Sequence, residues 1–129
     1  MKTKEKRSGT SLKNLIRAVK SLREAVQEPI RTDRDVAGVI KCFEVAYELS
    51  WKTLKKILEE QGVESAGPRD VFSKAFRLSL IDQEGAWLAI MDYRNLSVHV
   101  YDQKFARTLC EKIKADCLPA FEALAARIK

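Results

Sequence analysis

Apolar residues recur every three or four positions over most of the chain, which is the spacing of one face of an α-helix. The first such stretch is Ser11–Glu28, and a second, longer one is Val36–Gln61. Asp33 or Asp35 can cap the start of the second helix, and Gly62 suits its C-terminal end. The first half of the chain therefore predicts two amphipathic helices.

The second half of the chain contains shorter and less regular apolar stripes. Pro68 suits the first turn of a third helix, and Asp82 can cap a fourth. Asp102 is expected to cap a last long helix. Within it, Pro119 removes a backbone donor and clashes with the carbonyl four residues back. We expect a kink or short break near residues 115–118.

These elements indicate an all-α fold. Apart from the brief stretch 96–101, no segment alternates apolar and polar residues between turn signals, so no sheet is expected. Three long helices and two short ones predict an antiparallel four-helix-type bundle with a shorter irregular helix pair and a kinked C-terminal helix. The length of 129 residues fits one domain. We assign residues 11–129 to it and residues 1–10 to a basic, disordered tail.

The formal net charge of +6 is concentrated at the N-terminus. Residues 1–10 hold four basic residues and one acidic residue, a net +3, while residues 11–129 hold 20 basic and 17 acidic residues, also +3. Half of the excess charge therefore lies in the tail, and the body is mixed in sign. We interpret this charge as that of a solvated tail rather than as a sign of nucleic acid binding.

The cysteines offer no metal site. Cys42, Cys110 and Cys117 include no CxxC pair, and one histidine is too few to complete a zinc site with them. We expect reduced core thiols, no metal and no cofactor. The longest wholly apolar run, residues 86–91, is far too short to span a bilayer, and the charged N-terminus leads into no signal-peptide core. We expect a cytoplasmic protein that does not associate with membranes.

The only histidine, His99, lies where the helical pattern is weakest. In an unbroken helix Arg94 and His99 would point about 140° apart, because each residue turns the helix by about 100°. If the fourth helix ends near Asn95 and the last begins near Asp102, a turn can bring guanidinium, imidazole and the Tyr101 phenol to one cleft. Arginine forks onto phosphate oxygens, neutral imidazole can take a proton, and a phenol can accept a transferred group.

The same residues have a plain structural interpretation. His99 is then a loop histidine, and Tyr101 packs at a helix entry. Arg94 pairs with Asp92 or Asp102. Spacing alone favours this interpretation, because the motif is short and has no metal-type or triad-type partner elsewhere in the chain.

Two carboxylates of the second helix form a further candidate site. Glu44 and Glu48 are four residues apart on one face, a like-charge spacing that is unfavourable unless a cation answers it. Arg94 can be that cation. Alternatively, Glu48 pairs with Lys52 on the solvated side while the aromatic residues of this helix, Phe43, Tyr47 and Trp51, fill the core.

Several segments together resemble one known family. They are residues 42–55, Pro68-Arg69-Asp70-Val71, and Arg94-Asn95-Leu96 followed by His99 and Tyr101. From about residue 36 to the C-terminus the chain resembles the nucleotidyltransferase substrate-binding protein family, a branch of the HEPN superfamily of helical bundles. The spacing of Arg and His is similar to the HEPN ribonuclease signature. The tyrosine two residues later is similar to that of the HepT toxins, although Val100 stands where these often carry glycine.

The resemblance implies a two-chain system. Its partner is a minimal nucleotidyltransferase (MNT) antitoxin that transfers AMP to the motif tyrosine, here Tyr101. This chain lacks the Gly-Ser and Asp-x-Asp pattern of such enzymes, so we do not expect it to transfer nucleotides by itself. In the toxin version it is a homodimeric, metal-independent RNase in which Arg94 and His99 are catalytic. In the dimer, the fourth helix and the following turn face a second copy.

Two alternatives stay open at this point. The chain can be a non-catalytic subunit that presents a substrate to the nucleotidyltransferase, with the same cleft as its binding site. The binding groups would be Arg94, His99, Tyr101, Asn95 and one or both of Glu44 and Glu48. It can also be a purely structural helical assembly unit.

Overall fold

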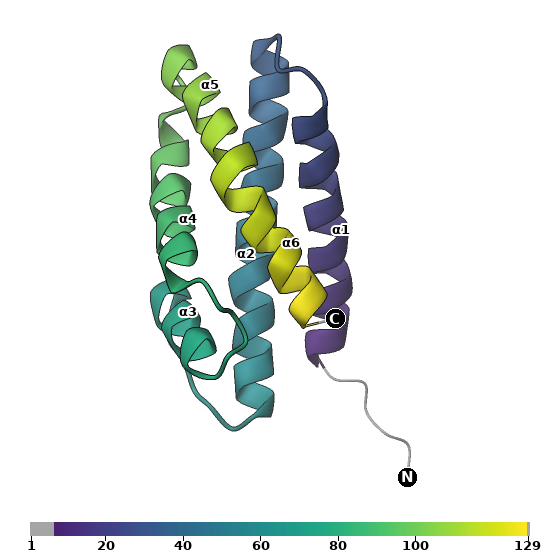
Figure 1. The fold of residues 1–129 in the computed structure, drawn as a ribbon, viewed down its shortest axis with the longest axis vertical. Coiled ribbons are helices and arrows are strands. Elements are labelled where there is room, and N and C mark those ends of the chain that lie inside the picture. The colour runs from purple at the N-terminus through teal and green to yellow at the C-terminus, as the bar shows by residue number, and fades with distance from the viewer. Residues whose placement is uncertain (1–6, 129) are drawn as a thin grey trace.

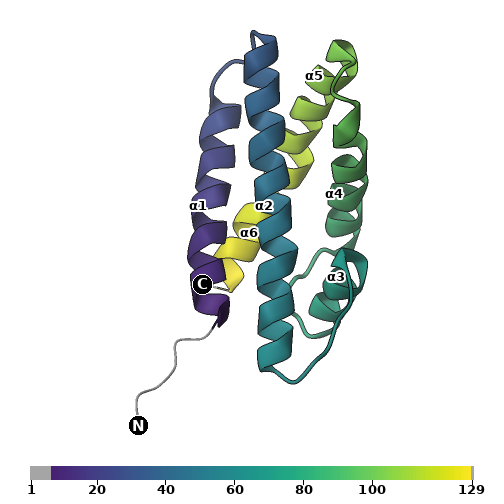
Figure 2. The same cartoon turned by 180° about the vertical axis from the view of Figure 1, so that it is seen from behind.

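The structure, a computed structural model, describes residues 7–128. Its helices are α1 (Arg7–Gln27), α2 (Asp33–Glu60), α3 (Pro68–Arg77), α4 (Glu84–Leu96), the short 3-10 turn η1 (Ser97–His99), α5 (Gln103–Lys112), the π-helical segment η2 (Ile113–Cys117) and α6 (Leu118–Arg127). No strand occurs among these residues. Helices α1 and α2 lie side by side, α3 and α4 follow one another beside α2, and α5 to α6 cross back towards α1 (Figure 1, Figure 2). The predicted all-α, antiparallel four-helix-type bundle is confirmed.

Helix α1 begins earlier than the apolar pattern predicts. Residues 7–10 form its first turn, so the predicted disordered tail is wrong for these four residues. The physical reason is a tertiary contact: Ser8 donates its backbone N–H and its hydroxyl to the Glu60 carboxylate at 3.3 and 2.7 Å. The last turn of α2 thereby stabilises the first turn of α1. Residues 1–6 of the predicted tail lie outside the described residues.

The N-cap of α2 is Thr32, not Asp33 or Asp35 as predicted. The Thr32 hydroxyl accepts the Asp35 N–H at 3.1 Å, and the Asp35 carboxylate accepts the Thr32 N–H at 3.0 Å. This reciprocal pair is a capping box. The backbone N–H groups of Arg31 and Thr32 hold the pKa of the Asp35 carboxyl below its ordinary value. Asp35 therefore contributes to the start of α2 from inside the helix.

Helices α2 and α3 end in the same backbone motif, one with glycine and one without. After α2, Gly62 takes a φ of 79°, and the next N–H donates to the Leu58 carbonyl at 2.8 Å. After α3, Ser79 takes a φ of 61°, and the next N–H donates to the Ala75 carbonyl at 2.8 Å. The predicted stop at Gly62 is confirmed. Ser79 holds a Cβ in a left-handed conformation that costs an L-residue about 1–2 kcal/mol.

Replacing Ser79 by glycine should raise the free energy of unfolding by about 1 kcal/mol, because glycine adopts positive φ without the Cβ strain. The hydrogen bond from Arg127 Nε to the Ser79 carbonyl, 2.8 Å, involves only the backbone of residue 79 and is retained. Urea unfolding measures the change. The matched control is Gly62→Ser, which should lower stability by a similar amount, because a Cβ there meets no atom within 4 Å and only the backbone is strained. Equal stability of all three proteins would contradict the assignment.

Asp82 does not cap α4, contrary to prediction. The N-cap is Gln83, which makes no side-chain capping bond. Asp82 instead lies 3.3 Å from Arg127 of α6 in an ion pair. Asp82 therefore joins the loop before α4 to the C-terminal helix.

The C-terminal helix has the predicted start and the predicted short break. The Asp102 carboxylate accepts the Phe105 N–H at 3.1 Å at the start of α5. Ahead of Pro119 the helix widens into η2, where the Leu118 N–H donates to the carbonyl of Ile113, five residues back. The wider turn accommodates a proline ring that would clash in a regular α-helix.

Aromatic side chains join the short helices to the long ones. Phe72 of α3 stacks on Trp87 of α4 with ring centroids 4.9 Å apart, and Trp87 meets Phe121 of α6 edge-on at 5.5 Å. Tyr47 of α2 lies 6.1 Å from Phe72. These rings lie in one core cluster. Trp51 is only half-buried at its edge.

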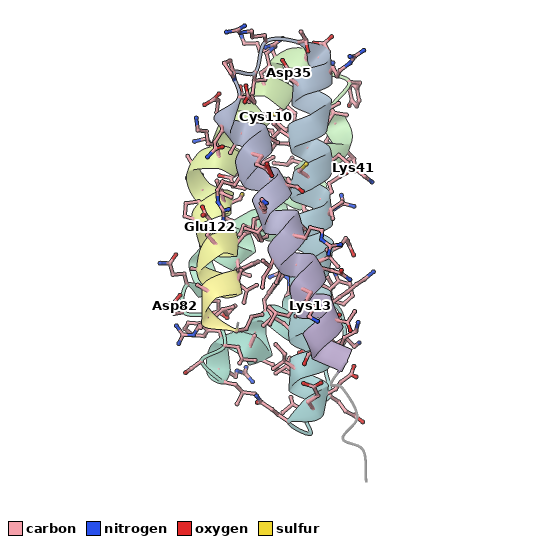
Figure 3. The ribbon with its side chains drawn as sticks, turned by 90° about the vertical axis from the view of Figure 1, so that its right-hand side faces the viewer. Lys13, Asp35, Lys41, Asp82, Cys110 and Glu122 are labelled. Carbon is pink, nitrogen blue, oxygen red and sulfur yellow. The ribbon has the colours of Figure 1, made fainter. Side chains whose placement is uncertain are left out.

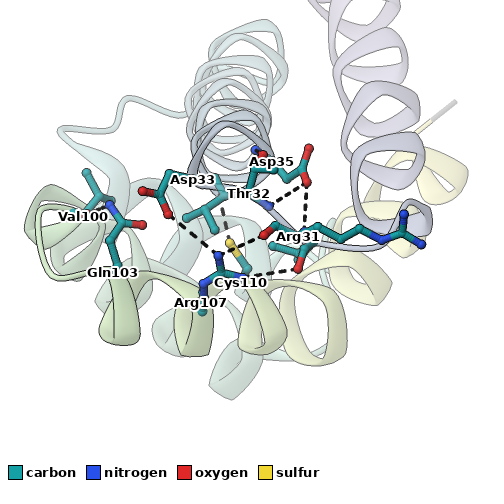
Figure 4. A network of polar contacts seen from close by, with 10 residues as sticks. Arg31, Thr32, Asp33, Asp35, Val100, Gln103, Arg107 and Cys110 are labelled. Atoms are coloured by element: carbon teal, nitrogen blue, oxygen red, sulfur yellow. Dashed lines mark hydrogen bonds and ion pairs between the residues drawn. The ribbon is translucent and has the colours of Figure 1, made fainter.

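Arg107 of α5 ties the C-terminal helix to the connection between α1 and α2 (Figure 4). Its guanidinium donates to the backbone carbonyls of Ile30 and Arg31 at 3.3 and 3.2 Å and lies 3.8 Å from the Asp33 carboxylate. Val100 lies at the same end of the bundle (Figure 4). These bonds anchor the end that carries the candidate site.

The cysteines are free thiols, as the sequence predicts. Cys110 and Cys117 are buried free thiols, and burial raises the pKa of Cys110 to about 11 and that of Cys117 to about 12. Cys42 is a half-buried free thiol. Lys13 and Lys41 are exposed on the outer faces of their helices (Figure 3). Within residues 7–128, every helix is too short or too polar to cross a membrane.

Candidate functional site

The segment between α4 and α5 breaks the helix where the sequence predicts. Helix α4 ends at Leu96, the 3-10 turn η1 covers Ser97–His99, and Asp102 caps α5. Val100 has φ −71° and ψ −7°, a right-handed conformation open to any L-residue. Valine therefore fits this turn without the positive φ for which glycine is needed. We call residues 94–101 the motif segment.

His99 and Tyr101 form the exposed part of the motif segment. The Nδ1 atom of His99 lies 3.1 Å from the Tyr101 hydroxyl, and the rings meet edge-on with centroids 5.8 Å apart. The exposed fraction of Tyr101 is 79%, the highest among the large apolar and aromatic residues that the structure describes. The Tyr101 side chain is therefore accessible at the surface. An imidazole and a phenol are thus held together at the surface.

Arg94 forms the inner part of the motif segment. Its Nη1 atom lies 3.5 Å from Glu44 Oε2 of α2 and donates to the buried Ser97 hydroxyl at 3.3 Å. The Ser97 hydroxyl lies in turn 2.9 Å from Glu44 Oε2, to which it can donate. The Nε atom of Arg94 is buried and has no partner among the described residues. Glu44 and Ser97 thus fix the guanidinium while one of its donors stays unused.

The structure separates the two carboxylates of the second helix. Glu44 is the partner of Arg94, whereas Glu48 lies 3.6 Å from Lys52 and accepts the Trp51 indole N–H at 3.2 Å. Both ion pairs considered from the sequence therefore occur: Arg94 pairs with Glu44, and Lys52 pairs with Glu48. Glu44, and not Glu48, is thus the carboxylate that pairs with Arg94 of the motif segment.

The motif segment has two parts that do not contact each other directly. No hydrogen bond or ion pair links Arg94 to His99 among residues 7–128. Asn95 is exposed and lines a hollow between α4, α2 and the start of α3. The segment offers a fixed cation, a proton-exchanging ring and an accessible hydroxyl, which together suit chemistry on a phosphate ester. In the described part of the chain, no group of three or more His, Cys, Asp or Glu residues could hold a metal ion.

Sequence reasoning missed Ser97, which links Glu44 to Arg94. Its signal was present: a small polar residue three positions after Arg94 faces the same side of a helical turn. It also missed Arg69 and the Tyr47 hydroxyl as polar groups near Asn95. These come from α3 and α2, so no local pattern connects them.

Comparisons with known proteins agree with this fold. Residues 10–129 match the family described as "Nucleotidyltransferase substrate binding protein like". A Haemophilus influenzae protein named "Probable ribonuclease HepT" is 34% identical over an alignment of 93 residues, and the match covers 68% of this chain and 64% of that protein. The matched region therefore spans less than two thirds of this relative.

Two solved structures are similar over most of their length. A Haemophilus influenzae structure, described as revealing the fold of a substrate binding domain of a nucleotidyltransferase, has a TM-score of 0.79 and 31% identity. The match covers 91% of this chain and 98% of that one. A crystal structure from Thermus thermophilus has a TM-score of 0.74 and 26% identity, with coverage of 88% and 94%.

Proposed function

Because this chain belongs to the nucleotidyltransferase substrate binding protein family, we propose that it is the HEPN-type partner of a minimal nucleotidyltransferase and a metal-independent ribonuclease. One observation carries the proposal: the motif segment holds His99 beside Tyr101 at the surface, and Glu44 and Ser97 fix Arg94 in the same segment. The name of the HepT relative supports the same activity. The substrate is RNA, and the partner is the nucleotidyltransferase.

The proposed cleavage uses the 2′-hydroxyl of RNA as its nucleophile. This oxygen loses its proton and bonds to the adjacent phosphorus, and the bond from phosphorus to the 5′-oxygen breaks. The products are a 2′,3′-cyclic phosphate and a 5′-hydroxyl, which takes up a proton. His99 removes the first proton or supplies the second, and Arg94 stabilises the extra charge on the phosphate oxygens. Purified chain incubated with labelled RNA and EDTA should yield these two ends.

A homodimer completes this site in the proposal. One chain has a single histidine, whereas cleavage needs both a base and an acid, so two motif segments across a two-fold axis supply both. Apolar side chains suited to such an interface are exposed on α4 and the turn, namely Leu88, Leu96 and Val98, the last with an exposed fraction of 61%.

The dimer is tested by sedimentation at micromolar concentration, where we expect two copies of the chain per particle. Val98→Glu should produce a monomer and lose cleavage, because it places a charge in the proposed interface. Leu78→Glu is the matched control, since Leu78 is an exposed apolar residue after α3 and outside that face. A monomeric wild-type protein, or dimers unaffected by Val98→Glu, would contradict the proposed geometry.

Tyr101 is the proposed acceptor of AMP. Its oxygen would bond to the α-phosphorus of ATP, the bond to pyrophosphate would break, and the phenol proton would pass to a base of the partner enzyme. The Nδ1 atom of His99 lies 3.1 Å from the Tyr101 oxygen. AMP on that oxygen adds a negative phosphodiester and a bulky adenosine beside the His99 ring. The modification would block the space that an RNA phosphate needs, so cleavage should fall.

Incubation with the partner nucleotidyltransferase, ATP and magnesium should add about 329 Da per AMP to the peptide that contains Tyr101. Tyr101→Phe should abolish this addition. The other two tyrosines are internal controls, because Tyr47 is buried and the Tyr93 hydroxyl donates to Asp116 at 2.9 Å. Labelling that persists in Tyr101→Phe, or its absence from the wild-type peptide, would show the assignment to be wrong.

A second function is a non-catalytic subunit that presents substrate to the nucleotidyltransferase. The ion pair of Arg94 with Glu44 favours it, because this cation is already partly neutralised before any ligand arrives. In that case the chain should not cleave RNA. Saturable ligand binding would then require the complex of both chains.

A further inference from the structure

A hollow of about 600 Å³ lies between α2, the start of α3 and α4. Its volume is in the range of sites for small organic ligands and larger than a bare phosphate requires. Residues that line it include Tyr47, Pro68, Arg69, Ser73, Met91 and Asn95. Polar groups from three helices thus face one space with two apolar walls, and none of these residues except Asn95 has a role in the function proposed above.

Tyr47 contributes a hydroxyl group to this hollow. Its exposed fraction is 6%, and its ring packs against Phe72 in the core. Its hydroxyl forms no hydrogen bond with any other described residue, yet the side chain lines the hollow. The hydroxyl oxygen is not among the buried side-chain atoms without a partner, so it reaches solvent. It can therefore bond to a ligand that enters the hollow.

Two arginines act on this hydroxyl. Burial and the charge of Glu48 raise the pKa of Tyr47, whereas the positive charges of Arg94 and Arg69 act in the opposite direction. Both guanidinium groups are therefore within electrostatic reach of one end of the hollow. Arg94 is fixed by Glu44, but Arg69 forms no ion pair or hydrogen bond with another described residue. Arg69 is a cation available to an anionic ligand.

The wall that carries Arg69 is already rigid. Asp70 accepts the Ala66 N–H at 2.8 Å and lies 3.0 Å from Lys74, and Lys55 donates to the Ala66 carbonyl at 3.2 Å. The one carboxylate at this wall is thus occupied by its own loop and is not free to bind a cation. These bonds hold the backbone that carries Arg69 before a ligand binds, so binding orders the Arg69 side chain but not its loop.

The hollow also lies directly beside the motif segment. Tyr47 follows Glu44 by one turn of α2, and Asn95 follows Arg94 on α4, so the hollow begins about 5 Å, one helical turn, from the Arg94 pair. A strand whose phosphate contacts Arg94 would place its next nucleotide there. Single-stranded RNA is recognised by arginine at its phosphates and by amide and hydroxyl groups at the edges of its bases.

Building on the proposed ribonuclease function, we propose that this hollow binds the nucleotide of the RNA strand next to the phosphate held by Arg94. Arg69 and the Tyr47 hydroxyl bind the phosphate of that nucleotide. Asn95 and Ser73 face the base, which packs between Pro68 and Met91. Arg69 is thus a second phosphate-binding cation of the site, and it comes from α3 rather than from the motif segment.

The test is binding of a short single-stranded 2′-O-methyl oligonucleotide, which lacks the reacting hydroxyl and is not cleaved, to the full chain. Arg69→Ala should weaken binding about tenfold, the effect of one charge-assisted contact. It should also reduce the slope of log affinity against log salt by about 0.7, as for one phosphate contact to a single strand. Tyr47→Phe keeps the ring volume and should weaken binding about threefold. Arg77→Ala is the control, because Arg77 lies on α3 outside the hollow.

Unchanged affinity and salt slope in Arg69→Ala would overturn this subsite, and so would equal losses in Arg69→Ala and Arg77→Ala. AMP is titrated separately to distinguish a free mononucleotide from a unit of a strand. If Arg69→Ala weakens the binding of AMP but not that of the oligonucleotide, the assignment is also overturned. If the wild type cleaves no RNA while Arg69→Ala still weakens oligonucleotide binding, the subsite stands without the ribonuclease chemistry. If cleavage depends on His99 but Arg69→Ala changes neither KM nor Kd, the subsite is wrong and the ribonuclease function stands.

Discussion

His99→Ala is expected to lower the rate of RNA cleavage by about 10²–10⁴-fold, the usual contribution of a positioned general acid or base. The chain has no second histidine to take over this role. The loss of cleavage rate should be the same with and without EDTA, because His99 and Arg94 carry the proposed chemistry. Single-turnover cleavage of labelled RNA measures the effect, and equal rates for wild type and His99→Ala would contradict the proposed mechanism.

Two further variants separate the chemistry from the structure of the turn. Tyr101→Phe removes the hydroxyl that lies 3.1 Å from His99 Nδ1 but leaves the imidazole in place, so cleavage should persist. Arg94→Ala should lower cleavage and also destabilise the chain, because it leaves the half-buried Glu44 carboxylate without its cation. Combining Arg94→Ala with Glu44→Gln should recover stability without recovering cleavage. Recovered cleavage in the double variant would contradict a direct role for Arg94 on the phosphate.

Phe72→Ala is expected to reduce the free energy of unfolding by about 3–5 kcal/mol, because it removes a fully buried ring and leaves a cavity. Phe72 stacks on Trp87 and packs against Tyr47, so the change loosens α3 from both α4 and α2. A whole domain is stable by only about 5–15 kcal/mol, so this one change should remove a large part of the stability. Urea unfolding at two temperatures measures the loss.

Phe76→Ala is the matched control on the same helix. The exposed fraction of Phe76 is 39%, so its removal takes less apolar surface out of the core and leaves no closed cavity. Its effect should stay below about 1 kcal/mol. Similar losses in both variants would show that α3 is held by its own helicity rather than by the aromatic core.

Most of the features that the sequence predicts correctly depend on residues close together in the chain. Apolar spacing of three or four positions identifies the helices, because one face of each must be buried. Gly62, Asp102 and Pro119 act on backbone groups within five residues, so the stop, the cap and the break in the helix follow from local chemistry. The break between Arg94 and Tyr101 is predictable for the same reason. So are the candidate residues that the motif segment itself contains.

Tertiary structure decides between partners that are locally equivalent. Asp82 can cap a helix, but Arg127 from α6 lies within reach and forms an ion pair with it. Residues 7–10 carry no strong apolar stripe, and they are helical where Ser8 meets Glu60. Glu44 and Glu48 have the same side chain, and only the packing of α4 against α2 places Arg94 beside the first.

The sequence by itself determined the helices, the stop of α2, the cap of α5 and the chemical groups of the motif segment, because these depend on backbone bonds and side-chain spacing within one or two turns. Only the tertiary structure decided which charges pair, and which polar groups from separate helices share one space. Tyr47, Arg69 and Asn95 are up to 48 positions apart, and they line one hollow because the aromatic core packs α3 against both α2 and α4. No periodicity along a chain encodes that distance, since it is set by packing between helices.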